Sequence, residues 1–158
     1  MTITLQAVAE HNFDAIIKLP LLPEQQGYLA SNAYSIAEAS FFRETHFPRA
    51  IYLGDKPIGF IMYASLLDDG QPDEYSIFRF MVESGEQGKG YGRRAIALVL
   101  DEIRSRPGAT VIYICYLPKN PVAKAFYGSL GFVETGLDED GDMIAEIRLD
   151  GACAAPSL

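Results

Sequence analysis

Cysteine, histidine and tryptophan are scarce in this sequence of 158 residues, which has two cysteines, two histidines and no tryptophan. Cys115 lies in an apolar run and Cys153 in a small-residue tail, so neither a disulfide framework nor a paired-cysteine metal site can be built. The apolar run favours a core position for Cys115 over a role as nucleophile. His11 and His46 have no second ligand at helical or hairpin spacing, so we expect no histidine-based triad and no metal.

Positive charge is also in short supply. The chain has 13 Lys and Arg residues against 21 Asp and Glu residues, and its formal net charge is −8. Such a surface repels nucleic acid and attracts cations, so we expect a small cationic amine as partner and no nucleic acid. The alternative is that the net charge chiefly keeps the protein in solution.

The start of the chain has neither a basic leader nor a long apolar segment. Residues 1–19 are interrupted by Glu10, His11 and Asp14, so we expect no export signal, no membrane span and a cytoplasmic location. No repeat or long linker divides the chain, and 49% of its residues are apolar. We therefore expect one domain over residues 1–150, followed by a frayed tail over residues 151–158.

The first half of the chain alternates at its start, then shows helical spacing, and then has a turn between two β-prone runs. Asn12 is placed to cap the first helix, and Gly54-Asp55 to form the turn. The expected elements are a strand over residues 2–8, a helix over 13–19, two helices within 24–44 with a break near 33–35, and a hairpin of strands 50–53 and 57–65.

The second half predicts a strand, a helix and a strand joined by a right-handed crossover, which makes the two strands parallel. Asn120-Pro121 is a strong helix start, and Gly131 is a left-handed stop. The expected elements are a strand over residues 74–82, a helix over 91–106, a strand over 110–117, a helix of about ten residues from Pro121, and an antiparallel strand over 143–149. The fold class is α+β with a mixed sheet.

The most informative segment is Gln87-Gly88-Lys89-Gly90-Tyr91-Gly92, between the expected strand and helix. Glycines let the backbone approach a ligand and leave amide N–H groups uncovered, and the helix start adds about half a positive charge. Lys89, Arg93 and Arg94 add full positive charges. A pyrophosphate fits such a turn, whereas a merely flexible turn does not explain why cations gather there in an acidic protein.

Two other glycine-rich nucleotide sites fit this segment less well. Its spacing is Gly-x-Gly-x-Gly instead of G-x-G-x-x-G, and no acidic residue follows at the end of the next strand, which disfavours a dinucleotide site. Lys89 is followed by Gly90 where a Walker loop has Ser or Thr, which disfavours that loop as well.

Two segments resemble the GNAT acetyltransferases. Phe80-Met81-Val82 with residues 87–94 resembles the family's acyl-CoA motif Q/R-x-x-G-x-G/A, and residues 120–127 with Leu130-Gly131-Phe132 resemble its later helix. The resemblance implies an α+β GNAT fold, with a mixed, mostly antiparallel sheet, splayed parallel strands and flanking helices. It also implies an N-acetyltransferase that uses acetyl-CoA. The residues it implies for acetyl-CoA binding are Phe80, Met81, Val82, Gln87, Gly88, Lys89, Gly90, Tyr91, Gly92, Arg93, Asn120, Ala123 and Lys124.

The resemblance also implies roles for single residues. The strand at Phe80 would pair its backbone with the pantetheine arm, and Asn120 would hydrogen-bond that arm. Tyr127 occupies the family's general-acid position, from which a phenol with a pKa of about 10 can donate a proton to the departing thiolate. Without the glycine turn and Asn120, Tyr127 reads as an ordinary core tyrosine of an amphipathic helix.

The acceptor amine must lose a proton before it attacks the thioester, because a primary amine with a pKa near 10.4 is mostly cationic in water. Glu74, near the start of the central strand, is the candidate base, and Tyr75 and Ser76 are candidates to hold a water. The other interpretation of Glu74 and its neighbour Asp73 is a solvated loop after Pro72.

Residues 23–32, 35–39, 50–52 and 132–136 resemble bacterial spermine/spermidine acetyltransferases of the BltD type, which implies a polyamine acceptor. A polyamine needs carboxylates distributed along a groove. The candidates are Glu24, Glu38, Glu44 and Asp73, each of which is otherwise a surface charge. Other acceptors, an aminoglycoside-like amine or a protein amine, stay open, as do a non-catalytic acyl-CoA sensor and a homodimer.

Overall fold

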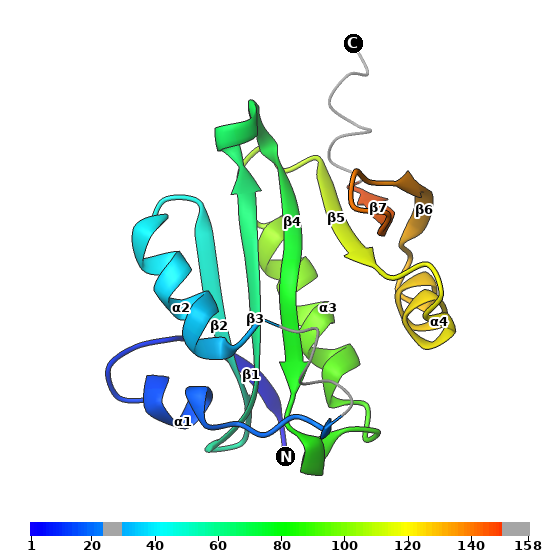
Figure 1. Cartoon of the computed structure of the whole chain (residues 1–158). Coiled ribbons are helices and arrows are strands. Elements are labelled where there is room, and N and C mark those ends of the chain that lie inside the picture. Colours follow the sequence, from blue (N-terminus) through cyan, green and yellow to red (C-terminus); the bar gives the residue numbers. More distant parts are fainter. Residues whose placement is uncertain (24–29, 150–158) are drawn as a thin grey trace. The chain divides into compact units, whose positions relative to one another are not determined.

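The computed structural model describes residues 1–23 and 30–149, which group into two compact units (Figure 1). Unit 1 comprises Met1–Ala64 and Arg79–Val99, and unit 2 comprises Ser65–Phe78 and the described part of Leu100–Leu158. The strands form a seven-stranded sheet in the order β1-β2-β3-β4-β5-β7-β6. The expected frayed tail, with Cys153, lies outside the described residues.

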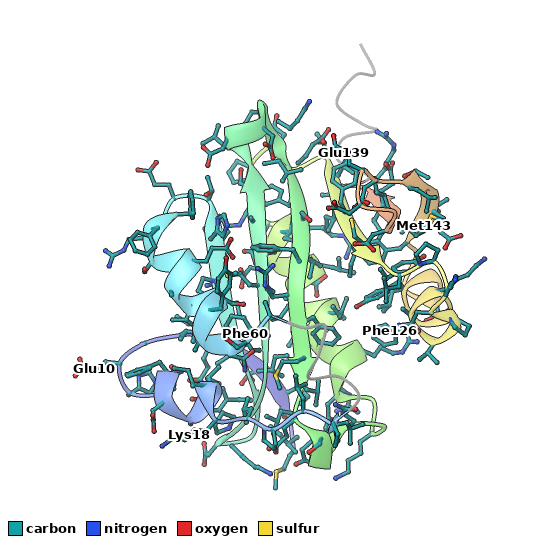
Figure 2. The ribbon with its side chains drawn as sticks, in the orientation of Figure 1. Glu10, Lys18, Phe60, Phe126, Glu139 and Met143 are labelled. Atoms are coloured by element: carbon teal, nitrogen blue, oxygen red, sulfur yellow. The ribbon has the colours of Figure 1, made fainter. Side chains whose placement is uncertain are left out.

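In unit 1, β2 pairs antiparallel with both β1 and β3, helix α2 packs against β2, and helix α1 packs against α2 (Figure 1). The hairpin between β2 and β3 is confirmed, and Gly54 makes its turn in the left-handed region at φ +60°. Strand β3 is buried through most of its length, and Phe60 in its middle is labelled in Figure 2. The elements are β1 Ile3–Ala7, α1 Phe13–Ile17, α2 Asn32–Phe41, β2 His46–Leu53 and β3 Lys56–Leu66.

The later elements confirm the expected crossover of strand, helix and strand. The parallel ladder between β4 and β5 joins Glu74–Ile77 to Val111–Ile114, and β4 continues past this ladder to Val82. Strand β7 lies antiparallel between β5 and β6, as expected of the last strand. The elements are η2 Leu67–Asp69, β4 Gln71–Val82, η3 Ser84–Glu86, α3 Tyr91–Arg104, β5 Val111–Tyr116, α4 Pro121–Ser129, β6 Val133–Leu137 and β7 Met143–Arg148.

Two expectations for the first half of the chain are wrong. Helix α2 begins at Asn32 and runs without interruption through the expected break at residues 33–35; its start is set by Ser31, whose side chain accepts a hydrogen bond from the amide of Tyr34. Asn12 stands at the N-cap position of α1, but its side chain makes no capping hydrogen bond: it instead accepts from the amide of Ala9 and donates to the carbonyl of Ala7, and so holds the preceding turn. The first of the two helices expected within residues 24–44 falls largely outside the described residues.

The expected core position of Cys115 is also wrong. Its side chain is exposed, whereas Val111, Ile112 and Ile114 of β5 are buried; Cys115 lies on the face of the strand opposite to Ile112 and Ile114. The sequence analysis also missed β6, whose short run of five residues contains Gly136. Among the described residues, no helix is both long and apolar enough to cross a membrane.

Candidate active site

The glycine turn follows the end of β4 in unit 1 and leads into α3. Its shape is fixed from the strand side, since Gln87 Nε2 donates a hydrogen bond to the carbonyl oxygen of Val82 at 2.8 Å. Gly88 and Gly90 have φ values of +77° and +85°, and a Cβ added at either would meet no atom within 4 Å. The turn therefore has open space above two glycines in the left-handed region, where a ligand can approach the backbone.

The third glycine of the motif has a different task. A Cβ at Gly92 would come within 3.0 Å of the Phe80 ring, so this glycine lets α3 pack closely against β4. The first turn of a helix presents amide N–H groups that the helix itself does not use, and in α3 Arg94 N donates to Gly90 O at 3.3 Å. Turn and helix start together form a cradle of amides suited to an anion, which fits the pyrophosphate of a CoA thioester.

The strand segment before the turn is held by a second close approach. A Cβ at Gly59 on β3 would lie 2.5 Å from the carbonyl oxygen of Met81. The Met81 side chain is buried, and its Sδ accepts a weak hydrogen bond from Asn32 Nδ2 at 3.6 Å. A glycine inside a strand is a sequence sign of a close backbone approach, and that sign was overlooked at Gly59.

Charge at the turn is more balanced than the sequence suggested. Lys89 Nζ bonds Glu86 at 2.7 Å, and Lys56 Nζ bonds Glu86 at 3.3 Å and Glu83 at 2.9 Å. The hydrogen bond from Lys89 holds the pKa of Glu86 below its usual value, and Glu86 in turn raises the pKa of Lys89. Lys89 is therefore already paired with a buried carboxylate. Arg93 and Arg94, both exposed on the first turn of α3, supply the remaining positive charge.

In unit 2, Asn120 begins α4 as expected. Its Oδ1 accepts a hydrogen bond from the amide of Ala123 at 3.0 Å, and its backbone oxygen accepts from the amide of Lys124 at 3.1 Å. Because the side-chain oxygen already serves the helix cap, the NH2 group is what Asn120 can offer a ligand. Lys124 Nζ lies 3.6 Å from Glu134 and is mostly exposed.

Tyr127 lies on α4 within a group of aromatic rings. Its ring stacks on Tyr116 at 5.6 Å and meets the edges of Phe126 at 5.1 Å and Phe132 at 5.9 Å; Phe126 is labelled in Figure 2. Burial, with a smaller effect from Tyr116, raises the pKa of Tyr127 to about 12. Its hydroxyl makes no hydrogen bond within residues 1–23 and 30–149. Tyr127 is therefore a protonated donor at neutral pH whose proton no described residue uses.

Glu74 lies on β4 in unit 2 and accepts a hydrogen bond from the Tyr113 hydroxyl at 2.8 Å. Burial and this bond raise the pKa of Tyr113 to about 12, so the phenol stays a donor. The sequence analysis missed Tyr113, which the parallel register of β4 and β5 pairs with Ser76, two residues along β4 from Glu74. Asp73 lies against the turn before β5: its backbone oxygen accepts from Thr110, and its carboxylate lies 2.9 Å from where a Cβ at Gly108 would be.

The proposed acceptor carboxylates differ in their surroundings. Glu38 on α2 is half-buried and bonds Arg79 at 3.2 Å, so its charge is already matched. Glu44 lies exposed in the turn between α2 and β2. Glu24 lies outside the described residues.

Comparison with known proteins decides the family. The model of the acetyltransferase (GNAT) family matches residues 13–132, which include the glycine turn, Asn120 and Tyr127. The chain belongs to the GNAT family. It is therefore an N-acetyltransferase, and acetyl-CoA is its acyl donor.

The proteins that this GNAT enzyme resembles are named for different amines. A spermine/spermidine N(1)-acetyltransferase of Bacillus subtilis (strain 168) is 26% identical over 150 residues, which cover 91% of this chain and 97% of the relative. Among solved structures, an aminoglycoside acetyltransferase in complex with coenzyme A has a TM-score of 0.77 at 18% identity, with 94% of this chain and 96% of that chain covered. A ribosomal-protein alanine N-acetyltransferase of Escherichia coli has a TM-score of 0.75 at 21% identity, with 99% of each chain covered. These two structures share the fold with this chain.

Proposed function

We propose that this N-acetyltransferase transfers the acetyl group of acetyl-CoA to a primary amine of a polyamine such as spermine or spermidine. The observation that carries the proposal is the alignment with the spermine/spermidine acetyltransferase of Bacillus subtilis, which spans 91% of this chain. The net charge of −8 supports it, because an acidic surface raises the local concentration of a polycation. An aminoglycoside or a protein amine is the alternative acceptor, since solved neighbours carry those names.

The fit of acetyl-CoA to these residues rests on the open space at Gly88 and Gly90 and on the amides at the start of α3. We assign the pyrophosphate to residues 87–94, the pantetheine arm to the backbone of residues 80–82, and a further hydrogen bond to the NH2 group of Asn120. The co-substrate supplies a thioester, an activated acyl group that a neutral amine can attack directly. No covalent acyl-enzyme is needed.

We assign the first proton transfer to Glu74. A polyamine enters as a cation, and one of its nitrogens must lose a proton before its lone pair can attack the thioester carbonyl. The bond from Tyr113 fixes one oxygen of Glu74 and leaves the other to accept this proton, directly or through a water. The new bond is N–C, the bond that breaks is C–S, and the amide product keeps no positive charge at that nitrogen.

Tyr127 is assigned to the leaving thiolate. Its pKa of about 12 means that it keeps its proton at any working pH. Full transfer of the Tyr127 proton to a thiolate with a pKa of about 8.5 costs roughly 5 kcal/mol. Tyr127 therefore stabilises the thiolate by donating a hydrogen bond, and the proton that the amine nitrogen releases on forming the amide converts the thiolate to the thiol. With its raised pKa, Tyr127 is suited to donate a hydrogen bond to the thiolate and not to give up its proton.

Replacement of Tyr127 by Phe tests this assignment. The ring packing remains, so acetyl-CoA binding by calorimetry should stay within about twofold, while kcat should fall by about 10²-fold or more because the donor is lost. In the wild type, kcat/KM should rise with pH as the amine loses its proton. It should show no decrease at any pH up to about 10, because Tyr127 stays protonated over that range. An unchanged kcat in Tyr127→Phe, or a fall near pH 8 that Tyr127→Phe abolishes, contradicts the assignment.

We assign recognition of the polyamine to the candidate carboxylates Glu24, Glu38, Glu44 and Asp73. Glu38 is paired with Arg79, so we assign the stronger attraction to the exposed carboxylate of Glu44, with Glu24 and Asp73 as further candidates. Glu44→Gln should raise KM for spermine about two- to fivefold, as expected of one screened surface charge, and leave kcat unchanged. Glu139→Gln, which removes the same charge from an exposed turn, is the matched control. Equal KM changes in both variants would show that the effect comes from the net charge of the protein and not from a specific contact of Glu44 with spermine.

We also propose a homodimer, supported by the exposed apolar side chains of the edge strand β6, where Val133 is 65% and Leu137 60% exposed. Sedimentation velocity of the wild type and of Leu137→Lys measures this, and a wild type that stays a monomer at every concentration excludes it. The cytoplasmic location and the lack of nucleic-acid binding stay predictions from the sequence.

A further inference from the structure

The ring of Tyr127 is stacked on a tyrosine that is itself held by a carboxylate. Tyr116 ends β5, and its ring lies 5.6 Å from that of Tyr127 with 16° between the planes. The Tyr116 hydroxyl donates a hydrogen bond to Glu134 Oε2 at 2.8 Å. Burial and this bond raise the pKa of Tyr116 to about 12, so its hydroxyl remains the donor. Strand β5, helix α4 and strand β6 therefore meet through these three side chains.

The other oxygen of Glu134 faces helix α4. Lys124 Nζ lies 3.6 Å from Glu134 Oε1, and its side chain is 65% exposed. A long, solvent-exposed ion pair contributes little, whereas a short hydrogen bond to a partly buried carboxylate is strong and directional. The link through Tyr116 is therefore the one that fixes geometry, and Lys124 is the weak arm of the cluster.

We propose that Glu134 is a positioning residue for acetyl transfer: it holds the ring of Tyr116, and the Tyr116 ring holds Tyr127 in the orientation that points its hydroxyl at the leaving thiolate. This inference rests on the role proposed for Tyr127. Phe132 also meets the Tyr127 ring edge-on, with 5.9 Å between the ring centroids, so the ring has one stacked partner in Tyr116 and an edge contact with Phe132. Stacking confines the plane of a ring, and the plane sets the direction in which its hydroxyl donates.

A graded set of variants separates this role from general stability. Glu134→Gln keeps a carbonyl acceptor but loses the charge, and Glu134→Ala loses the acceptor. Tyr116→Phe loses the donor and keeps the stacked ring. Lys124→Met removes the weak arm and serves only in the ring-signal readout without ligand, because Lys124 is also a candidate contact for acetyl-CoA. Tyr34→Phe, at an exposed position of α2, is the control for the loss of a phenol elsewhere.

The first readout needs no turnover. Full-length protein with ¹³C-labelled tyrosine rings gives one set of ring signals for each tyrosine, and the signals of Tyr127 are those that vanish in Tyr127→Phe. We expect Glu134→Ala and Tyr116→Phe to move the Tyr127 signals, Glu134→Gln to move them less, and Lys124→Met and Tyr34→Phe to leave them in place. Tyr127 signals that stay unchanged in both Glu134→Ala and Tyr116→Phe overturn the proposal.

The second readout is kinetic. Glu134→Ala and Tyr116→Phe should lower kcat by about tenfold while KM for acetyl-CoA stays within about twofold, because orientation and not binding is lost. Neither change should lower kcat further in a Tyr127→Phe background; additive losses there would overturn the link to Tyr127. If the wild type acetylates no amine, the proposed function fails, and the ring signals still decide whether Glu134 positions Tyr127.

Discussion

The glycine turn provides the sharpest prediction, because the chain offers a matched control for it. Gly90 and Gly70 have nearly the same φ, +85° and +80°, and a Cβ at either would meet no atom within 4 Å. Gly70 lies in the turn before β4 and outside the proposed acetyl-CoA segments. Replacing either glycine by Ala therefore imposes the same backbone strain without a clash, but only Gly90→Ala places a methyl group where the pyrophosphate is proposed to bind.

The magnitudes follow from the conformation. Forcing an L-residue into the left-handed region costs about 1–2 kcal/mol, which lowers Tm by about 2–8 °C for a domain of this size. This loss should be equal in both variants. A backbone hydrogen bond to a charged group contributes about 1.5–3 kcal/mol, so the loss of one such bond in Gly90→Ala weakens acetyl-CoA binding by about 10- to 100-fold. Gly70→Ala should bind acetyl-CoA as the wild type does.

Two measurements check the prediction. Thermal unfolding followed by circular dichroism gives the Tm values, and titration calorimetry gives Kd for acetyl-CoA and for desulfo-CoA, which keeps the pyrophosphate. The reasoning is refuted if Gly90→Ala binds both ligands as tightly as Gly70→Ala does, or if both variants lose binding equally.

Two further variants probe the strand and the helix that flank the same site. Gly59→Ala should both destabilise the protein by about 1–3 kcal/mol and weaken acetyl-CoA binding, because the added Cβ would lie 2.5 Å from the carbonyl oxygen of Met81 and push it away. Denaturant unfolding measures the stability and calorimetry the binding. An unchanged stability contradicts the close approach. Asn120→Asp keeps a cap for α4 but loses the NH2 donor. Tm should therefore stay within a few degrees of the wild type, while Kd for acetyl-CoA rises by about threefold or more. An unchanged Kd would show that Asn120 makes no hydrogen bond to acetyl-CoA.

Local sequence signals predicted most of the fold correctly. Asn120-Pro121 and the Gly54 turn act over a few residues, so the helix start and the hairpin could be read directly. The parallel pairing of β4 and β5 followed from the order of strand, helix and strand. The prediction for Asn12 was wrong because the same side chain can either cap a helix or hold a turn, and here it accepts a hydrogen bond from the amide of Ala9 in the preceding turn.

Tertiary pairing is what the sequence could not show. The cluster of cations at the glycine turn was visible, but Lys89 is paired with Glu86, whose carboxylate is buried beside it and also binds Lys56 from the hairpin turn. Likewise nothing in the local pattern separates the inward Ile114 from the outward Cys115, because an apolar run does not show which face of a strand is covered.

The central claim, acetyl transfer to a polyamine, is tested most directly by offering the full-length enzyme acetyl-CoA with spermine, spermidine, an aminoglycoside and a lysine peptide in one equimolar mixture and weighing the products by mass spectrometry. The account predicts singly acetylated spermine or spermidine as the main product, with one free CoA released for each acetyl group transferred. Acetylation of the peptide or the aminoglycoside in preference to both polyamines would contradict the proposed acceptor, and no acetylated product from any amine, despite acetyl-CoA binding, would contradict the proposed mechanism.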